Sequence, residues 1–262
     1  MKGNMQVRKR NFAQTGKDIS LLGLGTVKFG RNQGVKYPEG EGFKLPSDQE
    51  IINILNICIE HGINLLDTAP AYGTAEERLG KALKAFNRDD FFIATKTGEE
   101  FENGESQHIF TKKHTQMSIE RSLRRLGTDR LDSVLVHCNH NDKEIIENTP
   151  VLETLSRLKE KGDILSYGAS TYSIETGKKV VDLCDTVMVA YNPDYTDELS
   201  VIEYAKEQNK AVLIKKGLAS GHIGKLSPQE TIQHIVSTPG VTSMIFGSLT
   251  PQHILDNIKA IR

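Results

Sequence analysis

Four side chains in the first half of the sequence have the chemistry needed to deliver a proton. Tyr72 follows Asp67 by five residues in a turn-rich segment, and Lys96 and His137 each lie near the end of a short apolar run. A tyrosine with an ordinary pKa near ~10 is a weak acid at neutral pH unless a cation stabilises its phenolate. Lys96 would be that cation, Asp67 would keep it charged and oriented, and His137 would donate to a substrate oxygen or relay a proton. Together they predict a proton-delivering site around a carbonyl oxygen.

The elements that must position these side chains follow a strand and helix rhythm. Short apolar runs that end in small or polar residues alternate with longer amphipathic segments, which is typical of parallel strands joined by helices. The runs are Ile19–Thr26, Ile63–Thr68, Phe91–Thr97, Leu131–Cys138, Ile164–Ser170, Thr186–Tyr191, Ala211–Lys215 and Val241–Gly247. Eight units favour a closed barrel, for which about 250 residues is a usual length. We therefore predict an α/β fold, a single-domain (β/α)8 TIM barrel over residues 1–262.

An open, doubly wound sheet is the alternative arrangement of parallel strands. A sheet of that kind that binds a dinucleotide normally carries a Gly-x-Gly-x-x-Gly turn after its first strand. The corresponding segment here, Gly23-Leu24-Gly25-Thr26, has no third glycine at the required place. The sequence therefore favours the barrel.

Helix boundaries are marked by capping residues. Three hydroxyl residues each precede a glutamate by three positions and predict capping boxes: Ser47, Thr74 and Ser227. Thr149-Pro150 and Thr250-Pro251 predict further helix starts, and Gly62, Gly127 and Gly162 predict helix ends. Two long connections, 27–46 and 98–113, follow strand ends at the face where barrel active sites are built.

The last residues of the predicted strands should point toward one shared mouth. These residues are Thr26, Asp67, Lys96, His137, Ser170, Asn192, Lys215 and Lys216. In a barrel, side chains at the carboxyl ends of several strands converge on a single site. A reduction at this mouth would need an external hydride carrier, because none of these side chains is an electron source.

Composition predicts an ordinary globular protein. The chain has 37% hydrophobic and 26% charged residues and a formal net charge of −1. No strong field favours nucleic acid or a membrane surface, and no apolar run approaches the eighteen or so residues of a membrane span, so we expect a cytoplasmic protein. A metal site is not expected. His137, Cys138 and His140 lie close together, but alternate strand residues face opposite ways and no further ligand completes the set.

These residues and their surroundings resemble the aldo-keto reductase family. Asp67, Tyr72, Lys96 and His137 match its catalytic tetrad, and the similarity covers nearly the whole chain. It includes the segments Leu22–Thr26, Leu66–Gly73 with Glu76, Leu79 and Gly80, Ser122–Asp129, Tyr167–Ser170 and Asp256-Asn257. The resemblance implies reduction of an aldehyde or ketone, with Tyr72 as general acid, Lys96 and Asp67 tuning its pKa, and His137 orienting the carbonyl group.

The resemblance also implies a nicotinamide cofactor, NADP(H) by family preference with NAD(H) as the alternative. Its expected contacts are Gly25 and Thr26 near the nicotinamide, Ser170 and Thr171 at the carboxamide, Leu218 and Ser220 at the pyrophosphate, Gly247 and Ser248 at the adenosine phosphate, and Asp256 and Asn257 at the adenine. Amides at the start of the last helix would favour the phosphate. The substrate is expected to be a small carbonyl compound.

Several positions in this groove depart from the family pattern. Met188 replaces a common glutamine, and Thr171 replaces a common asparagine, so recognition of the carboxamide should be altered. Lys215 replaces the aromatic residue that usually stacks on the nicotinamide, and we expect its stem to meet the ring while its ammonium is directed toward phosphate. Lys215 and Lys216 would then grip the pyrophosphate. Gly247 and His253 replace basic residues, which leaves the choice between NADP and NAD open.

Two other functions remain open. Lysines at barrel strand ends also form Schiff bases with carbonyl substrates, as in aldolases, and Lys96 and Lys215 are the candidates. Asp67 argues against Lys96, because a Schiff-base lysine must lose its proton. A non-catalytic regulatory barrel that binds nucleotide is the other alternative, and the altered groove is the reason to retain it.

Overall fold

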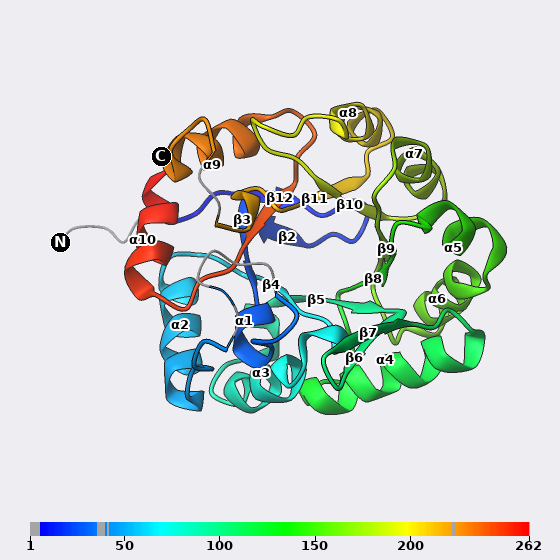
Figure 1. Ribbon diagram of the computed structural model, residues 1–262, viewed down its shortest axis with the longest axis horizontal. Helices are drawn as coiled ribbons and strands as arrows, with labels where there is room; N and C mark the ends of the chain where they lie inside the picture. Colours follow the sequence, from blue (N-terminus) through cyan, green and yellow to red (C-terminus); the bar gives the residue numbers. More distant parts are fainter. Residues whose placement is uncertain (1–5, 36–39, 41, 222–223, 262) are drawn as a thin grey trace.

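The computed structural model describes residues 6–35, 40, 42–221 and 224–261. Within them, parallel strands close into a barrel surrounded by helices, which Figure 1 shows nearly end-on. The barrel strands are β3 (Leu22–Gly25), β4 (Leu65–Asp67), β5 (Phe92–Thr97), β8 (Ser133–His137), β9 (Tyr167–Ser170), β10 (Thr186–Ala190), β11 (Ala211–Lys215) and β12 (Ser243–Phe246). Each lies inside one of the eight predicted runs. The predicted (β/α)8 barrel is confirmed.

The helices that cover the barrel are α1 (Val27–Gly30), α2 (Asp48–Glu60), α3 (Ala75–Leu83), α4 (Lys112–Leu126), α5 (Asp142–Asn148), α6 (Val151–Lys161), α7 (Ile174–Leu183), α8 (Leu199–Glu207), α9 (Pro228–Ser237) and α10 (Pro251–Lys259). Short 3-10 helices are η1 (Pro70–Tyr72), η2 (Arg88–Asp90) and η3 (Ala219–Gly221). Amphipathic helices bury their apolar stripes against the outer face of the sheet. No helix of the described residues is both long and apolar enough to span a bilayer.

Two of the three predicted capping boxes are present. The hydroxyls of Ser47 and Ser227 each accept from the amide of the glutamate three residues on, and the carboxylate of that glutamate accepts from the serine amide. The prediction for Thr74 is wrong. Its backbone (φ −88°, ψ 10°) is not the extended form from which a hydroxyl reaches back to the helix, and its side chain makes no capping bond. Gly127 and Gly162 end their helices in the left-handed conformation, as predicted.

An N-terminal hairpin closes one end of the barrel. Strands β1 (Lys9–Asn11) and β2 (Asp18–Ser20) pair antiparallel, and Figure 1 shows β2 lying across the barrel. Phe12 and Ile19 are fully buried and pack with residues that point into the barrel, including Phe92, whose ring centroid is 4.6 Å from that of Phe12. The hairpin therefore seals the end from which β3 starts, and leaves the opposite end, where the strands finish, as the mouth.

A second hairpin lies beside the mouth. Strands β6 (Glu99–Glu102) and β7 (Glu105–His108) pair antiparallel within the long connection 98–113. The sequence predicts only a loop there, because the segment is polar on both faces and has no buried apolar alternation. The hairpin packs against η1. It therefore brings side chains from a connecting segment into the neighbourhood of Tyr72.

Candidate active site

An ion pair between Asp67 and Lys96 lies at the barrel mouth. Asp67 is the last residue of β4, and Lys96 lies one residue before the end of the neighbouring strand β5. The Lys96 Nζ donates to Asp67 Oδ1 over 2.6 Å and to the Thr68 carbonyl oxygen over 3.0 Å. The two side chains are only 1% and 5% exposed. Buried charges are tolerated when each has a partner, so this pair fixes a cation beneath the mouth.

Tyr72 is placed by the short helix η1. Pro70 begins this helix with its preset φ, and the Tyr72 amide donates to the Ala69 carbonyl oxygen over 3.0 Å. Gly73 follows with a φ of 62°, and a Cβ at this position would lie 2.3 Å from the Gly30 carbonyl oxygen. Glycine is therefore required directly after Tyr72, both for the turn and for the close approach of the backbone at Gly30.

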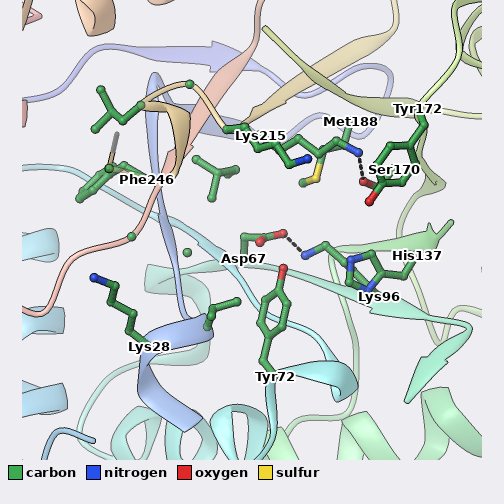
Figure 2. Close-up of a pocket in the computed structure, with 18 residues that line it drawn as sticks. Lys28, Asp67, Tyr72, Lys96, His137, Ser170, Tyr172, Met188, Lys215 and Phe246 are labelled. Carbon is green, nitrogen blue, oxygen red and sulfur yellow. Dashed lines mark hydrogen bonds and ion pairs between the residues drawn. The ribbon is translucent and has the colours of Figure 1, made fainter. Parts of the chain in front are cut away.

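The phenol of Tyr72 faces three of the predicted site residues. Figure 2 shows its hydroxyl directed toward the Asp67 and Lys96 pair. The Lys96 Nζ lies 4.9 Å from the centroid of the tyrosine ring, and the His137 ring meets that ring edge-on with centroids 6.1 Å apart. The structure thus brings Asp67, Tyr72, Lys96 and His137 together around one small volume. A cation beside a phenol stabilises the phenolate, so the arrangement can release a proton.

His137, the last residue of β8, contacts a carboxylate that we did not predict from the sequence. Its Nδ1 lies 2.7 Å from Glu99 Oε2 in hairpin strand β6. Burial lowers the pKa of His137, and this effect outweighs the opposing influence of Glu99. Burial by itself would raise the pKa of Glu99, but the contact with His137 and the Ser106 hydroxyl bring it down to about 2. The carboxylate is therefore charged at neutral pH, and it lies close to His137 Nδ1 although that nitrogen makes no hydrogen bond of acceptable geometry among the described residues.

Lys215 occupies the opposite wall of the mouth. Its Nζ donates to Ser170 Oγ over 2.9 Å and to the Thr171 carbonyl oxygen over 2.7 Å, and it lies 4.1 Å from the Tyr172 ring centroid. Two acceptors on β9 and the loop after it hold the ammonium in the described structure. The expectation that this ammonium is directed toward phosphate stays a prediction. Burial lowers the pKa of Lys215 to about 8, although the carboxylate of Glu198 opposes the shift.

A cavity of about 320 Å³ joins these groups. The lining contains ten of the predicted site residues: Gly25, Asp67, Tyr72, Lys96, His137, Ser170, Lys215, Lys216, Leu218 and Gly247. Figure 2 shows Lys215 and Ser170 facing Tyr72 across the open space. The predicted convergence of strand ends therefore produces one shared pocket rather than separate surface groups.

Other predicted cofactor contacts do not line this cavity. Thr26 and Thr171 are fully buried; the Thr26 hydroxyl donates to the Asp67 carbonyl oxygen, whereas the Thr171 hydroxyl has no hydrogen-bond partner among the described residues. Ser248 bonds within its own turn before α10, and Asp256 and Asn257 lie on α10. The backbone of Ser220 belongs to η3, and its side chain lies outside the described part of the structure.

The cavity has lining residues that the sequence reasoning missed. They are Val27, Lys28, Tyr172, Gly221, Ile245 and Phe246. Tyr172 follows the strand-end residue Ser170 by two positions. It would have been found if the first loop residues after each strand had also been considered as candidates. Glu99 gave no signal of its own, because its role depends on a hairpin between charged strands.

The lining fits a phosphate-bearing nicotinamide cofactor. Among its described residues are four lysines and one aspartate, so the pocket has an excess of positive charge that suits an anionic ligand. Met188, Ile245 and Phe246 add apolar surface on which a planar ring can lie. A nicotinamide dinucleotide combines these two properties. No group of three His, Cys, Asp or Glu side chains in the described residues is arranged to hold a metal ion.

The chain is similar to a solved structure of an aldo-keto reductase. The chain superposes on a candidate aldo-keto reductase from Pseudomonas aeruginosa with a TM-score of 0.90 and 39% sequence identity, covering 100% of this chain and 97% of that one. The likeness therefore extends over all of this chain and nearly all of the other, and is not restricted to the barrel strands.

Curated relatives agree. The chain is 31% identical to Aldo-keto reductase YhdN of Bacillus subtilis over 231 residues, 85% of this chain and 66% of the relative. It is 34% identical to D-arabinose 1-dehydrogenase of Saccharomyces cerevisiae over 148 residues, 54% of this chain and 42% of the relative. The chain thus spans less than two thirds of these two relatives. A sequence profile of the Aldo/keto reductase family matches residues 21–230. The chain belongs to the aldo/keto reductase family.

Proposed function

We propose that the protein is an NAD(P)H-dependent oxidoreductase that reduces an aldehyde or ketone to an alcohol, with Tyr72 as the general acid. The observation that carries this proposal is the buried ion pair of Lys96 and Asp67 directly beside the Tyr72 phenol, in a pocket with excess positive charge. Family membership supports it, since relatives are named reductases and dehydrogenases. A small carbonyl compound is the substrate class that this arrangement can reduce.

The residues divide the proton chemistry among them. Tyr72 gives its phenolic proton to the carbonyl oxygen, and Lys96 stabilises the phenolate that remains. Asp67 holds Lys96 charged and aimed by the 2.6 Å bond. His137 contacts the carbonyl oxygen and orients the substrate. When bound, the reduced nicotinamide would supply a hydride, that is, one hydrogen nucleus with two electrons, to the carbonyl carbon. Proton and hydride together convert C=O into CH–OH.

Several side chains would hold the cofactor. We expect Lys216, which lines the cavity, to contact its phosphates, and Gly247 with Ser248 precedes α10, whose first amides favour an anion. Ser170, the residue expected at the carboxamide, is already bonded by Lys215. We therefore infer that Lys215 and Ser170 act as one unit at the nicotinamide end. NADP(H) is the family expectation and NAD(H) the alternative, so the first measurement is a parallel titration with NADPH and NADH.

The decisive experiment removes only the phenolic hydroxyl. In Tyr72→Phe we expect turnover of an aldehyde and ketone panel to fall by three orders of magnitude or more, about the upper end of what general acid catalysis contributes. Cofactor affinity should change less than about twofold, because the acid acts in the chemical step and not in ground-state binding. Tyr204→Phe is the matched control, since this tyrosine bonds Asp182 on the outer surface. Unchanged rates in Tyr72→Phe would refute the mechanism.

A Schiff-base enzyme is a second candidate, which the lowered pKa of Lys215 favours. A lysine with a pKa of about 8 carries a reactive neutral fraction at mildly alkaline pH. Borohydride trapping with a ketone, without nicotinamide, tests this function. A covalent adduct on Lys215 would support a Schiff-base aldolase. If the protein binds NADPH but neither reduces nor forms an adduct with any carbonyl compound, a regulatory function would be supported.

A further inference from the structure

The ammonium of Lys215 is held in the pocket by neutral groups. Its acceptors are the Ser170 hydroxyl at 2.9 Å and the Thr171 carbonyl oxygen at 2.7 Å, and neither carries a charge. Lys96, which lines the same cavity, instead donates to the carboxylate of Asp67 over 2.6 Å, so that pair has no net charge. The charge of Lys215 is not offset in this way.

The proposed reaction brings the nicotinamide ring into the cavity that Lys215 lines. The carbonyl carbon is one bond from the oxygen that Tyr72 protonates, and Figure 2 shows Lys215 facing Tyr72 across the open space. The oxidised ring carries a positive charge that the reduced ring lacks, whereas the phosphates are the same in both. We propose that Lys215 distinguishes the two redox states of the cofactor, because its ammonium repels the oxidised ring. This inference rests on the proposed carbonyl reduction.

The position of the ammonium is fixed by contacts within the protein. Lys215 ends β11, and its Nζ lies 4.1 Å from the centroid of the Tyr172 ring, which is an attractive cation–π arrangement. One of its two acceptors is held in turn, since the Thr171 amide donates to the Met188 carbonyl oxygen over 3.1 Å. The ammonium cannot turn away from an incoming cation without losing these contacts. The repulsion is therefore expressed in the affinity for the ligand.

The ammonium is mostly charged at pH 7, because burial lowers the pKa of Lys215 only to about 8. The titratable groups around it are Glu198, Lys216, Lys96, Cys138, His137 and Tyr172. The carboxylate of Glu198 favours the charged form, and the other two lysines disfavour it. Glu198 Oε2 accepts from an amide of β10, and this carboxylate does not line the cavity. A ring in the cavity therefore meets the ammonium and not the carboxylate.

The repulsion has a direction and a size. Two unit charges on opposite sides of a cavity of about 320 Å³ repel enough to change a dissociation constant by about tenfold at the usual effective dielectric constant. For a two-electron couple, a tenfold preference for the reduced form raises the potential of the bound cofactor by about 30 mV. The overall equilibrium of the reaction is unchanged. The oxidised cofactor, however, becomes a weak product inhibitor, which suits a protein that works in the direction of reduction.

The test compares dissociation constants without any substrate. NADPH and NADP⁺, and likewise NADH and NAD⁺, are titrated calorimetrically at pH 7, and the ratio of oxidised to reduced cancels every contribution that the two forms share. The ratio should fall about tenfold in Lys215→Met and stay within about twofold of wild type in Lys215→Arg, which keeps the charge. Lys28→Met is the matched control, since Lys28 lines the same cavity from α1, away from Lys215 in Figure 2, and should act on both redox states alike.

An unchanged ratio in Lys215→Met, or an equal fall in Lys28→Met, would overturn the proposal. If Lys215→Met does not fold, the wild-type protein at pH 9 gives the same reading, because Lys215 is then mostly neutral and the ratio should fall; a ratio that stays flat from pH 7 to pH 9 would overturn the proposal. A protein that binds no dinucleotide would refute the proposed function as well. A protein that binds both redox states with a ratio independent of Lys215 would retain the proposed function and refute this inference alone.

Discussion

The ammonium of Lys215 on β11 donates to the hydroxyl of Ser170 on β9, across the intervening strand β10. On the intervening strand, Met188 pairs with Ser170 and Ala190 pairs with Lys215, and neither apolar side chain competes for the ammonium. Three positions that depart from the family pattern, Thr171, Met188 and Lys215, are therefore adjacent in space. Met188 and Lys215 line one altered wall of the pocket, and the backbone of Thr171 binds both of them, through its carbonyl oxygen to Lys215 and through its amide to Met188.

This wall predicts pH-dependent cofactor binding. The Lys215 ammonium is charged below its pKa of about 8 and neutral above it, so its attraction for an anionic dinucleotide is present at low pH and lost as the pH rises. We expect the dissociation constant of NADPH to increase several-fold between pH 7 and pH 9. In Lys215→Met the constant should be higher at pH 7 and nearly flat with pH, as measured by fluorescence titration. Lys179→Met, which removes an exposed lysine paired with Glu147, serves as the control.

A result in which wild type and Lys215→Met have the same pH dependence would assign that dependence to another group. Lys216 is the neighbouring candidate in the same cavity. Titration of Lys216→Met in the same way would distinguish the two lysines.

The buried pair of Asp67 and Lys96 predicts a strong asymmetry between single and double substitutions. Asp67→Asn leaves the Lys96 charge buried without its partner, and removal of one member of a buried pair costs about 3–5 kcal/mol. Lys96→Met leaves the carboxylate in the same position. The double variant leaves no unpaired charge and should be more stable than the sum of the single effects implies. Urea unfolding of the four proteins measures the coupling, and simple additivity would contradict it.

The barrel architecture and the convergence of Asp67, Tyr72, Lys96 and His137 at its mouth could be predicted because each depends on local pattern. Apolar runs identified the strands, and the residue at each strand end had to face the mouth whatever the loops did. Glu99 could not be predicted in this way, because its contact with His137 depends on the pairing of two charged strands that have no apolar periodicity. Thr26 and Thr171 show that a position at or just after a strand end does not guarantee access to the cavity. Both side chains are small, are covered by their neighbours and do not reach the cavity.

Substitution of Asp142 should reduce folding stability, because this residue holds the loop that carries Tyr172. Its carboxylate accepts from the amides of Tyr172 and Ser173 at 2.7 and 2.8 Å, and from the hydroxyls of Ser173 and Thr176. It thereby ties the start of α5 to the start of α7. Asp142→Asn replaces one acceptor oxygen with a donor group that faces existing donors. We expect the free energy of unfolding to fall by about 1–3 kcal/mol.

The same substitution should also affect the pocket, because Tyr172 packs on Lys215. We expect weaker NADPH binding with little change in the chemical step, which fluorescence titration and single-turnover rates separate. Asp182→Asn is the control, since this carboxylate lies on the outer surface of α7 and bonds only Tyr204 among the described residues. A loss of stability without any change in affinity would show that the loop keeps its place without Asp142.

A methyl group added at Gly73 should impair the site, although Gly73 does not line the cavity. Gly73→Ala places a Cβ 2.3 Å from the Gly30 carbonyl oxygen, where both partners are backbone, and at a φ of 62° that side chains rarely adopt. Relief of the clash requires η1 to move away from α1, and Tyr72 is the last residue of η1. A displacement of about 1 Å at a catalytic group can cost about a hundredfold in rate. We therefore expect kcat to fall by about that factor while NADPH affinity changes much less. Gly104, at the exposed tip of the β6–β7 hairpin where a Cβ meets nothing within 4 Å, also has a positive φ (85°), so Gly104→Ala controls for backbone strain alone. If both variants lose activity equally, strain and not the position of Tyr72 is responsible.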